Sequence, residues 1–165
     1  MINDLLDIEK LEAGKMQLLI EELPINELLE KALGDMSSEI DLSEPSENIS
    51  IAVDRDRMLQ ALSNLVSHAL KTRVGKEHIQ LKVEKHADFV EINLEMKGLP
   101  IPEHMQERLF DRFGRNISSD DIDDQNSGLA LPIAKRIVES HGGKIGVKSD
   151  ENQKTNIFWM RLPKH

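Results

Sequence analysis

The segment that most constrains the fold is Asp54–Arg73, DRDRMLQALSNLVSHALKTR, because it has the period of an amphipathic helix. Its apolar residues fall on one side at 3.6 residues per turn: Met58, Leu59, Leu62, Leu65, Val66, Ala69 and Leu70. A polar stripe occupies the opposite side: Gln60, Asn64, His68 and Lys71. Asp54 is a suitable N-cap, and Gly75 follows the last turn. We therefore predict a helix that buries one face and presents an amide, an imidazole and an ammonium on the other.

The remaining patterns predict further helices and strands. Helices are expected at residues 1–13, 25–36, 103–113 and 129–141, and strands at 17–22, 49–53, 79–83, 90–94, 144–148 and 157–162. Residues 37–48 are expected to be mostly loop, and residues 114–127 a mobile loop. Antiparallel hairpins with helices gathered on one face make a two-layer α/β sandwich of the α+β class.

The predicted core joins two groups of apolar residues. The helices contribute Leu62, Leu65, Val66, Ala69, Ile133, Ile137 and Val138. The strands contribute Leu81, Val83, Ile92, Leu94, Ile145 and Ile157.

Composition excludes several classes of partner. The net charge of −9 argues against nucleic acid and against contact with an anionic membrane. No apolar run approaches the roughly 18 residues that span a bilayer. The absence of cysteine is compatible with a reducing, cytoplasmic setting, which we expect.

Four segments, in this order, resemble the catalytic and ATP-binding domain of sensor histidine kinases, in the GHKL ATPase superfamily. LLDIEKLEAGKMQL (5–18) looks like the end of the dimerisation and phosphotransfer helix, and DRDRMLQALSNLVSHALK like the asparagine box. RLFDRFGR (108–115) looks like the phenylalanine box, and GLALPIAKRIVESHGGKIGVKS (128–149) like the last glycine box with its helix and strand. The resemblance implies a helical tail at residues 1–16, an ATPase domain at 17–165, and a mixed, mostly antiparallel sheet.

The resemblance places an ATP site at Asn64, His68, Lys71, Met96, Gly98, Gly128 and Ala130. Several of these positions depart from the family pattern. His68 stands where the family has a Mg²⁺-binding asparagine, and imidazole is a poor ligand for that hard ion. Met96 stands where an aspartate accepts a hydrogen bond from adenine, and Pro100 replaces a glycine of the D-x-G-x-G box.

The phosphate-facing elements are altered as well. The last glycine box keeps Gly128 but has Ala130 in place of a glycine, and glycines there let backbone N–H groups close on phosphate. The loop 114–127 carries four aspartates against Arg115, which repels a polyanion. Losing one charged hydrogen bond and one metal ligand would weaken nucleotide binding by about 10² to 10⁴.

We therefore expect a pseudokinase: an ATPase-like domain of a two-component sensor kinase homologue that acts through protein contacts, with no cofactor. Expected partners are a response regulator or another kinase, with a possible homodimer through the upstream helix. One alternative is an active kinase domain that binds ATP and Mg²⁺ and phosphorylates a histidine outside this chain. A second is an anti-sigma or phosphotransfer adaptor.

We assign no catalytic and no metal-ligating residue from the sequence. His68 could bind a soft metal, but it has no partner ligand at helical spacing. His78 and His86 flank a strand without metal spacing. His104 and His141 are expected to be surface or capping residues, with His141 a cation at a helix C-terminus.

Overall fold

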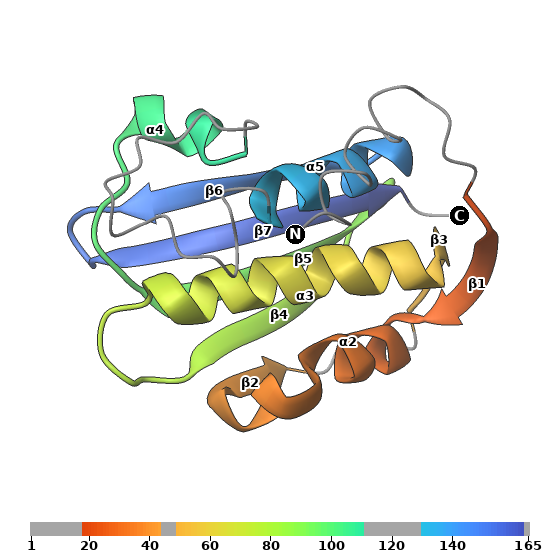
Figure 1. The fold of residues 1–165 in the computed structure, drawn as a ribbon, viewed down its shortest axis with the longest axis horizontal. Coiled ribbons are helices and arrows are strands. Elements are labelled where there is room, and N and C mark those ends of the chain that lie inside the picture. Colours follow the sequence, from red (N-terminus) through yellow and green to blue (C-terminus); the bar gives the residue numbers. More distant parts are fainter. Residues whose placement is uncertain (1–17, 44–48, 111–129, 164–165) are drawn as a thin grey trace.

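The computed structural model describes residues 18–43, 49–110 and 130–163, which form an α+β fold of two layers (Figure 1). The main sheet contains β2 (Ile40–Ser43), β4 (Ile79–Lys85), β5 (Phe89–Lys97), β6 (Lys144–Asp150) and β7 (Thr155–Pro163). Their order is β2-β4-β5-β7-β6, and only the β2–β4 pair is parallel. A separate antiparallel ribbon pairs β1 (Ile20–Pro24) with β3 (Ser50–Asp54).

The helices are α2 (Ile25–Leu33), α3 (Arg55–Thr72), α4 (Glu103–Arg108) and α5 (Ala130–Ser140), and a 3₁₀ turn, η1, spans Gly34–Glu39. Figure 1 shows α2, α3 and α5 lying over one face of the sheet, with α3 across the middle and α4 near β6. The predicted fold class, including the mixed sheet, is confirmed.

The central helix lies where its sequence predicts and packs between α2 and α5. Leu62, Leu65, Val66 and Ala69 are at most 1% exposed. Truncating a side chain buried to this degree removes apolar contacts and leaves a cavity, so this face makes a large contribution to stability.

Most of the predicted core is confirmed, but Ile157 is not part of it. On β7 the buried side chains are those of Phe158, Met160 and Leu162, so Ile157 faces the opposite side of the sheet with Trp159. Ile157 is half-buried on that outer face, where it pairs with Glu95. The prediction was wrong because Ile157 and Phe158 are both apolar, and the alternation does not decide which of them points inward.

Asp54 joins three elements through hydrogen bonds. Its carboxylate accepts from the backbone N–H of Arg57 (3.3 Å), which confirms the N-cap, and from the N–H of Leu19 (3.0 Å). Its own N–H donates to Nε2 of His141 (2.9 Å), and Nδ1 of that ring donates to the carbonyl of Ile137 (2.7 Å). His141 thus caps α5 as expected. It does so as a neutral ring, not as the predicted cation, because Nε2 must accept.

Several elements differ from the sequence prediction in their bounds, and three of these differences have a clear local cause. α2 ends at Leu33 instead of residue 36, because Gly34 adopts φ 46° and ψ −123°, which no helix accommodates. The first strand, β1, ends at Pro24, two residues later than predicted, because the antiparallel ribbon continues to the pair formed by Pro24 and Ser50. The predicted loop 37–48 contains η1 and β2, whose short Ile40-x-Leu42 alternation gave too little signal.

The added strand β2 is held to β4 by side chains as well as backbone. Asp41 accepts hydrogen bonds from the His78 ring (2.9 Å) and from the Gln80 amide (2.9 Å). The bond from His78, which has the larger effect, and the bond from Gln80 together hold the pKa of the Asp41 carboxyl below its usual range. The tail at 1–16, the loop 114–127 and Gly128 lie outside the described residues.

Candidate functional site

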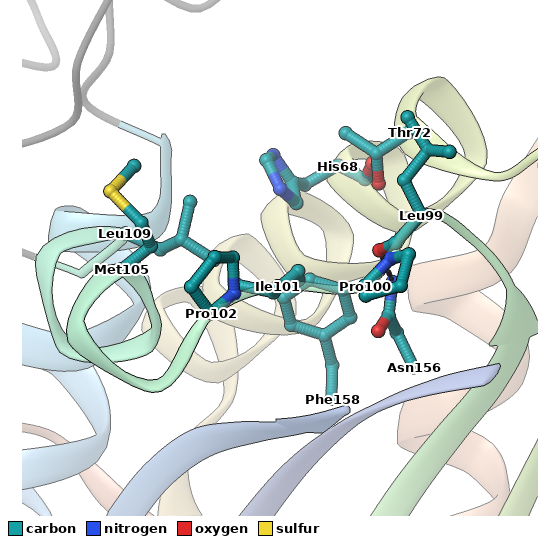
Figure 2. Close-up of a pocket in the computed structure, with 10 residues that line it drawn as sticks. All are labelled: His68, Thr72, Leu99, Pro100, Ile101, Pro102, Met105, Leu109, Asn156 and Phe158. Atoms are coloured by element: carbon teal, nitrogen blue, oxygen red, sulfur yellow. Dashed lines mark hydrogen bonds between the residues drawn. The ribbon is translucent and has the colours of Figure 1, made fainter. Parts of the chain in front are cut away.

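A cavity of about 410 Å³ lies where the C-terminal half of α3 meets the loop 98–102, α4 and β7 (Figure 2). Its polar lining comes from His68, Thr72 and Asn156. Its apolar lining comes from Leu99, Pro100, Ile101, Pro102, Met105, Leu109 and Phe158. This volume suits a small ligand, and the lining among the described residues is mostly apolar, as in typical ligand pockets.

His68 faces the sheet and not the solvent. It is 9% exposed, and its ring meets that of Phe158 edge to face, with centroids 5.4 Å apart and planes at 81° (Figure 2). Its carbonyl accepts from the hydroxyl of Thr72 (2.9 Å). The prediction that His68 belongs to an outward polar stripe was therefore wrong: Phe158 of β7 covers this ring, although Lys71, one turn further on, is exposed.

Asn156 closes the floor of the cavity below the loop. It is 3% exposed, it pairs across the sheet with Met96, and its Nδ2 donates to the carbonyl of Leu99 (2.9 Å) (Figure 2). That bond fixes the amide orientation, because a flipped amide would set two oxygens against each other. Its Oδ1 is buried and makes no hydrogen bond within the described part of the chain.

Gly98 is required by the same contact. A Cβ at this position would lie 2.5 Å from Nδ2 of Asn156. The N–H of Gly98 donates to the carbonyl of Lys154 (3.0 Å), so the backbone cannot easily retreat. Met96 is also buried at 3%, beneath the loop, and it does not line the cavity.

The loop 98–102 is anchored at its far end. The N–H of Ile101 donates to the hydroxyl of Ser149 (2.9 Å), and the carbonyl of Ile101 accepts from the Gln106 amide (2.9 Å). Pro100 lines the cavity between these anchors. The two prolines of the loop fix its φ angles and remove two N–H donors that a ligand could have used.

The other predicted site residues are spread over neighbouring positions. Asn64 is half-buried, and its Nδ2 donates to the carbonyl of Ala130 (3.1 Å), which ties α3 to the first residue of α5. Lys71 is exposed on the last turn of α3. None of Asn64, Lys71 and Ala130 lines the cavity.

These side chains fit an uncharged planar group better than a magnesium triphosphate. The cavity is large enough for a ring system, and its walls are apolar. The position that the family resemblance gives to a metal-binding oxygen holds a buried imidazole that meets the ring of Phe158 edge to face. Because Mg²⁺ requires oxygen ligands in tight octahedral geometry, this donor set does not suit it.

Sequence reasoning missed most of the cavity lining. Thr72, Met105 and Leu109 come from helical segments whose periods predict only burial, and Phe158 comes from a strand assigned to the core. Asn156 was the detectable signal: it is a polar residue on the inward alternation of β7, which continues with the apolar Phe158, Met160 and Leu162.

Comparison with known proteins identifies the family. The sequence pattern described as "Histidine kinase-, DNA gyrase B-, and HSP90-like ATPase" matches residues 53–165. The chain belongs to this family. The match covers α3, the cavity and all of the main sheet except β2.

Curated proteins similar to this chain include sensor protein kinases. The chain is 31% identical over 170 residues to the sensor protein kinase WalK of Staphylococcus haemolyticus, and 29% identical to that of Staphylococcus epidermidis. Each alignment covers 99% of this chain and 28% of the relative's length. The chain therefore spans less than a third of the length of these relatives.

Solved structures agree with the fold. The nucleotide-free catalytic domain of the histidine kinase ThkA is 28% identical, with a TM-score of 0.73 over 90% of this chain and 97% of that domain. Full-length ShkA, in complex with AMPPNP, is 23% identical and has a TM-score of 0.78 over 99% of this chain and 35% of its own. The second likeness supports the fold alone. Within the described residues, no helix has the length and apolar character needed to cross a bilayer.

Proposed function

We propose that this domain is the ATPase-like part of a two-component sensor histidine kinase homologue that works as a pseudokinase, with little or no ATP binding. The proposal rests on the family, on relatives named sensor protein kinases, and on the chemistry of the cavity. In this proposal the fold is retained because its surfaces bind other proteins. The former nucleotide site remains as a cavity but does not bind or transfer phosphate.

The observation that carries the proposal is the placement of His68. The imidazole stands where the resemblance gives a magnesium ligand; it is 9% exposed and packs on Phe158. A side chain packed in this way supports the hydrophobic wall of the cavity. It offers nitrogen where Mg²⁺ prefers oxygen, so the domain lacks a means of neutralising a triphosphate.

Protein partners follow from the same proposal. Two-component signalling implies a response regulator or another kinase as the partner, in a cytoplasmic setting, and residues 1–16 are a candidate for homodimer contact. The net charge of −9 disfavours nucleic acid. Capture with purified response regulators, compared with purified sigma factors, distinguishes a signalling module from an anti-sigma adaptor.

Calorimetric titration of the purified domain with Mg-ATP is the direct test. We expect no heat of binding at micromolar nucleotide concentrations. A dissociation constant in the low micromolar range would overturn the pseudokinase proposal.

Reversion sharpens that test. The variant combining His68→Asn, Met96→Asp and Pro100→Gly restores the family's polar residues and backbone freedom, and it is expected to gain measurable affinity for Mg-ATP. The matched control combines His68→Leu, Met96→Leu and Pro100→Ala, which changes the same positions without adding a ligand for metal or adenine. Equal affinities in the two variants would show that the substituted positions do not determine nucleotide binding.

One observation favours the alternative of an active kinase domain. A cavity large enough for a ring system lies beside His68, and Asn64 and Lys71 are retained. Transfer of phosphate from labelled ATP to a separately supplied dimerisation and phosphotransfer domain distinguishes the two functions. The pseudokinase proposal predicts no labelling above that seen with a Lys71→Ala variant.

A further inference from the structure

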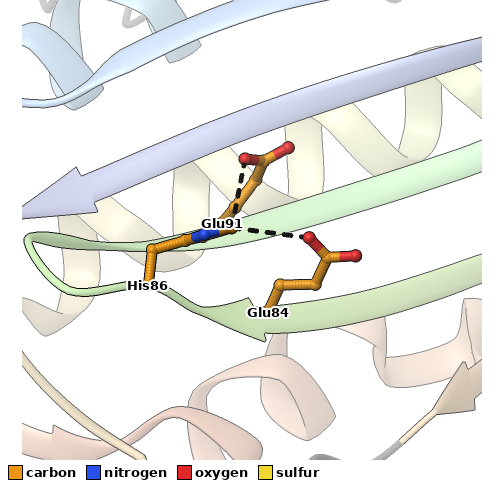
Figure 3. Close-up of side chains that lie close together, drawn as sticks. All are labelled: Glu84, His86 and Glu91. Carbon is orange, nitrogen blue, oxygen red and sulfur yellow. Dashed lines mark ion pairs between the residues drawn. The ribbon is translucent and has the colours of Figure 1, made fainter.

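The tip of the β4–β5 hairpin gathers three side chains of metal-binding type on the face of the sheet that points away from the helices. Glu84 lies on β4 and Glu91 on β5, and His86 lies in the turn between them (Figure 3). One ligand atom from each residue lies within 4.8 Å of the other two. The sequence spacing of His86 does not indicate this cluster, because Glu91 is brought next to it by the pairing of β4 with β5.

Strand register forces the two carboxylates together. Glu84 and Glu91 are direct partners in the antiparallel ladder. Like charges at such positions destabilise a sheet unless a cation lies between them. Glu91 is only 11% exposed at its side chain, so solvent screens its charge poorly. The pair therefore favours a cation at this point.

The His86 imidazole is aimed at both carboxylates without hydrogen-bonding either of them. Its Nε2 lies 3.4 Å from Glu84 Oε2 and 3.7 Å from Glu91 Oε2 (Figure 3). This nitrogen is closed to solvent, and in the described part of the chain it makes no hydrogen bond. Nε2 of His86 therefore faces two carboxylate oxygens at distances that a bridging cation could draw together.

The spacing suits a tetrahedral ion. Zinc bonds of about 2.0–2.2 Å to nitrogen and oxygen place neighbouring ligand atoms in a tetrahedral site about 3.3–3.6 Å apart. The two distances from Nε2 are close to this value, so small side-chain rotations would complete three coordination positions and leave a fourth for water. One imidazole with two carboxylates favours zinc-like ions over Mg²⁺ or Ca²⁺.

The surrounding residues hold the ligands in place. The N–H of His86 donates to the carbonyl of Phe89 (2.8 Å), and the two rings stack with centroids 4.5 Å apart. Nε of Arg161 donates to Glu91 Oε2 (3.2 Å), and its guanidinium lies over the rings of Phe89 and Trp159. This arginine orients Glu91, while its positive charge opposes the binding of a metal ion beside it.

We propose that Glu84, His86 and Glu91 form a binding site for a divalent transition ion of the zinc type, which fastens the tip of the β4–β5 hairpin. The site is separate from the cavity between α3 and β7 and does not depend on nucleotide binding.

Calorimetric titration with zinc chloride alone, on the full chain, tests the site. We expect one ion per chain in the submillimolar range or tighter. His86→Ala and Glu84→Gln should each weaken binding at least about tenfold. Glu84 is 56% exposed at its side chain, so its substitution by glutamine leaves the fold intact even if the turn variant does not.

The matched control is His78→Ala. His78 is another exposed imidazole next to a carboxylate, 2.9 Å from Asp41, but it faces one acidic group and not two. Its removal should leave zinc affinity unchanged, and Arg161→Met should raise affinity by removing the competing cation. Absence of zinc binding, or equal loss in the His78 and His86 variants, would overturn the proposal and assign the cluster to an imidazolium bridge alone.

A spectroscopic readout locates the ion independently. Trp159 is the only tryptophan, and it lies next to Arg161, whose guanidinium carbon is 4.8 Å from the indole centroid. Cobalt(II) bound at the hairpin should quench its fluorescence and develop tetrahedral absorption bands. Both signals should disappear with excess zinc and be lost in Glu84→Gln. Cobalt quenching that survives in Glu84→Gln would place the ion elsewhere.

Discussion

Nε2 of His141 accepts a hydrogen bond from the backbone N–H of Asp54, so the C-terminus of α5 is joined to the N-terminus of α3 across 87 residues of sequence. The other ring nitrogen donates to the carbonyl of Ile137. One neutral imidazole thus bonds both the backbone N–H at the start of α3 and a backbone carbonyl in the last turn of α5.

Replacing that ring should loosen both helix ends. His141→Ala leaves a partly buried N–H at Asp54 without its acceptor, which costs about 1–3 kcal/mol. Urea unfolding of the variant measures the loss. His104→Ala serves as the control, because His104 is exposed on α4 and should change stability by less than about 0.5 kcal/mol. Equal effects of the two substitutions would show that the ring bridge contributes nothing.

The face assignment of α3 makes a second prediction. Leu62 is 1% exposed, so Leu62→Ala should lower the free energy of unfolding by about 2–5 kcal/mol through lost contacts and a residual cavity. Leu99, at 74% exposed, provides a leucine control whose truncation should be nearly neutral. A loss below half a kcal/mol for Leu62→Ala is incompatible with the described core.

The contact between Gly98 and Asn156 predicts an energetic coupling. Gly98→Ala places a methyl group 2.5 Å from Nδ2 and should cost about 1–3 kcal/mol, because the overpacked amide must release the Leu99 carbonyl. In an Asn156→Ala background the clash is absent, and the same substitution should cost much less. A double-mutant cycle by denaturant unfolding measures this, and additive effects would contradict the contact.

The lowered pKa of Asp41 predicts an acid-dependent contribution from the β2 edge. Because the folded state holds this pKa below 3.8, the ionised carboxylate stabilises the fold above that pH, and the contribution fades as the pH falls through the folded value. Carbon NMR titration of the side chain should give a midpoint below 3.8 in the native protein. His78→Ala removes the larger cause and should move the midpoint upward, while an unchanged midpoint would assign the shift to Gln80.

Sequence reasoning succeeded where one periodicity covered a long segment. The eighteen residues of α3 repeat the apolar pattern often enough to fix the buried face, and Asp54 marks its start. The same reasoning missed β2, whose four residues pair in parallel with a strand about forty residues away, a contact that no local pattern encodes.

The site was harder to predict than the fold, because its geometry depends on which elements lie over one another. His68 has the helical phase of the polar residues around it, yet it is covered by β7 through Phe158. Glu91 becomes a neighbour of His86 only through the register of a hairpin. Side chains whose surroundings come from a distant strand cannot be placed by periodicity alone.

The hydrogen bond from the N–H of Leu19 to the Asp54 carboxylate connects the N-cap of α3 to the chain that enters the domain. The chain arrives from residues 1–17 and, at its first described strand, is bonded to the carboxylate that also holds the first turn of α3, while the same residue's N–H holds the end of α5. Tension on the incoming segment therefore bears on the first turn of α3 and on the last turn of α5 at once. α3 runs from this shared anchor to the cavity wall, so strain at the entry of the domain is delivered along its axis toward the cavity.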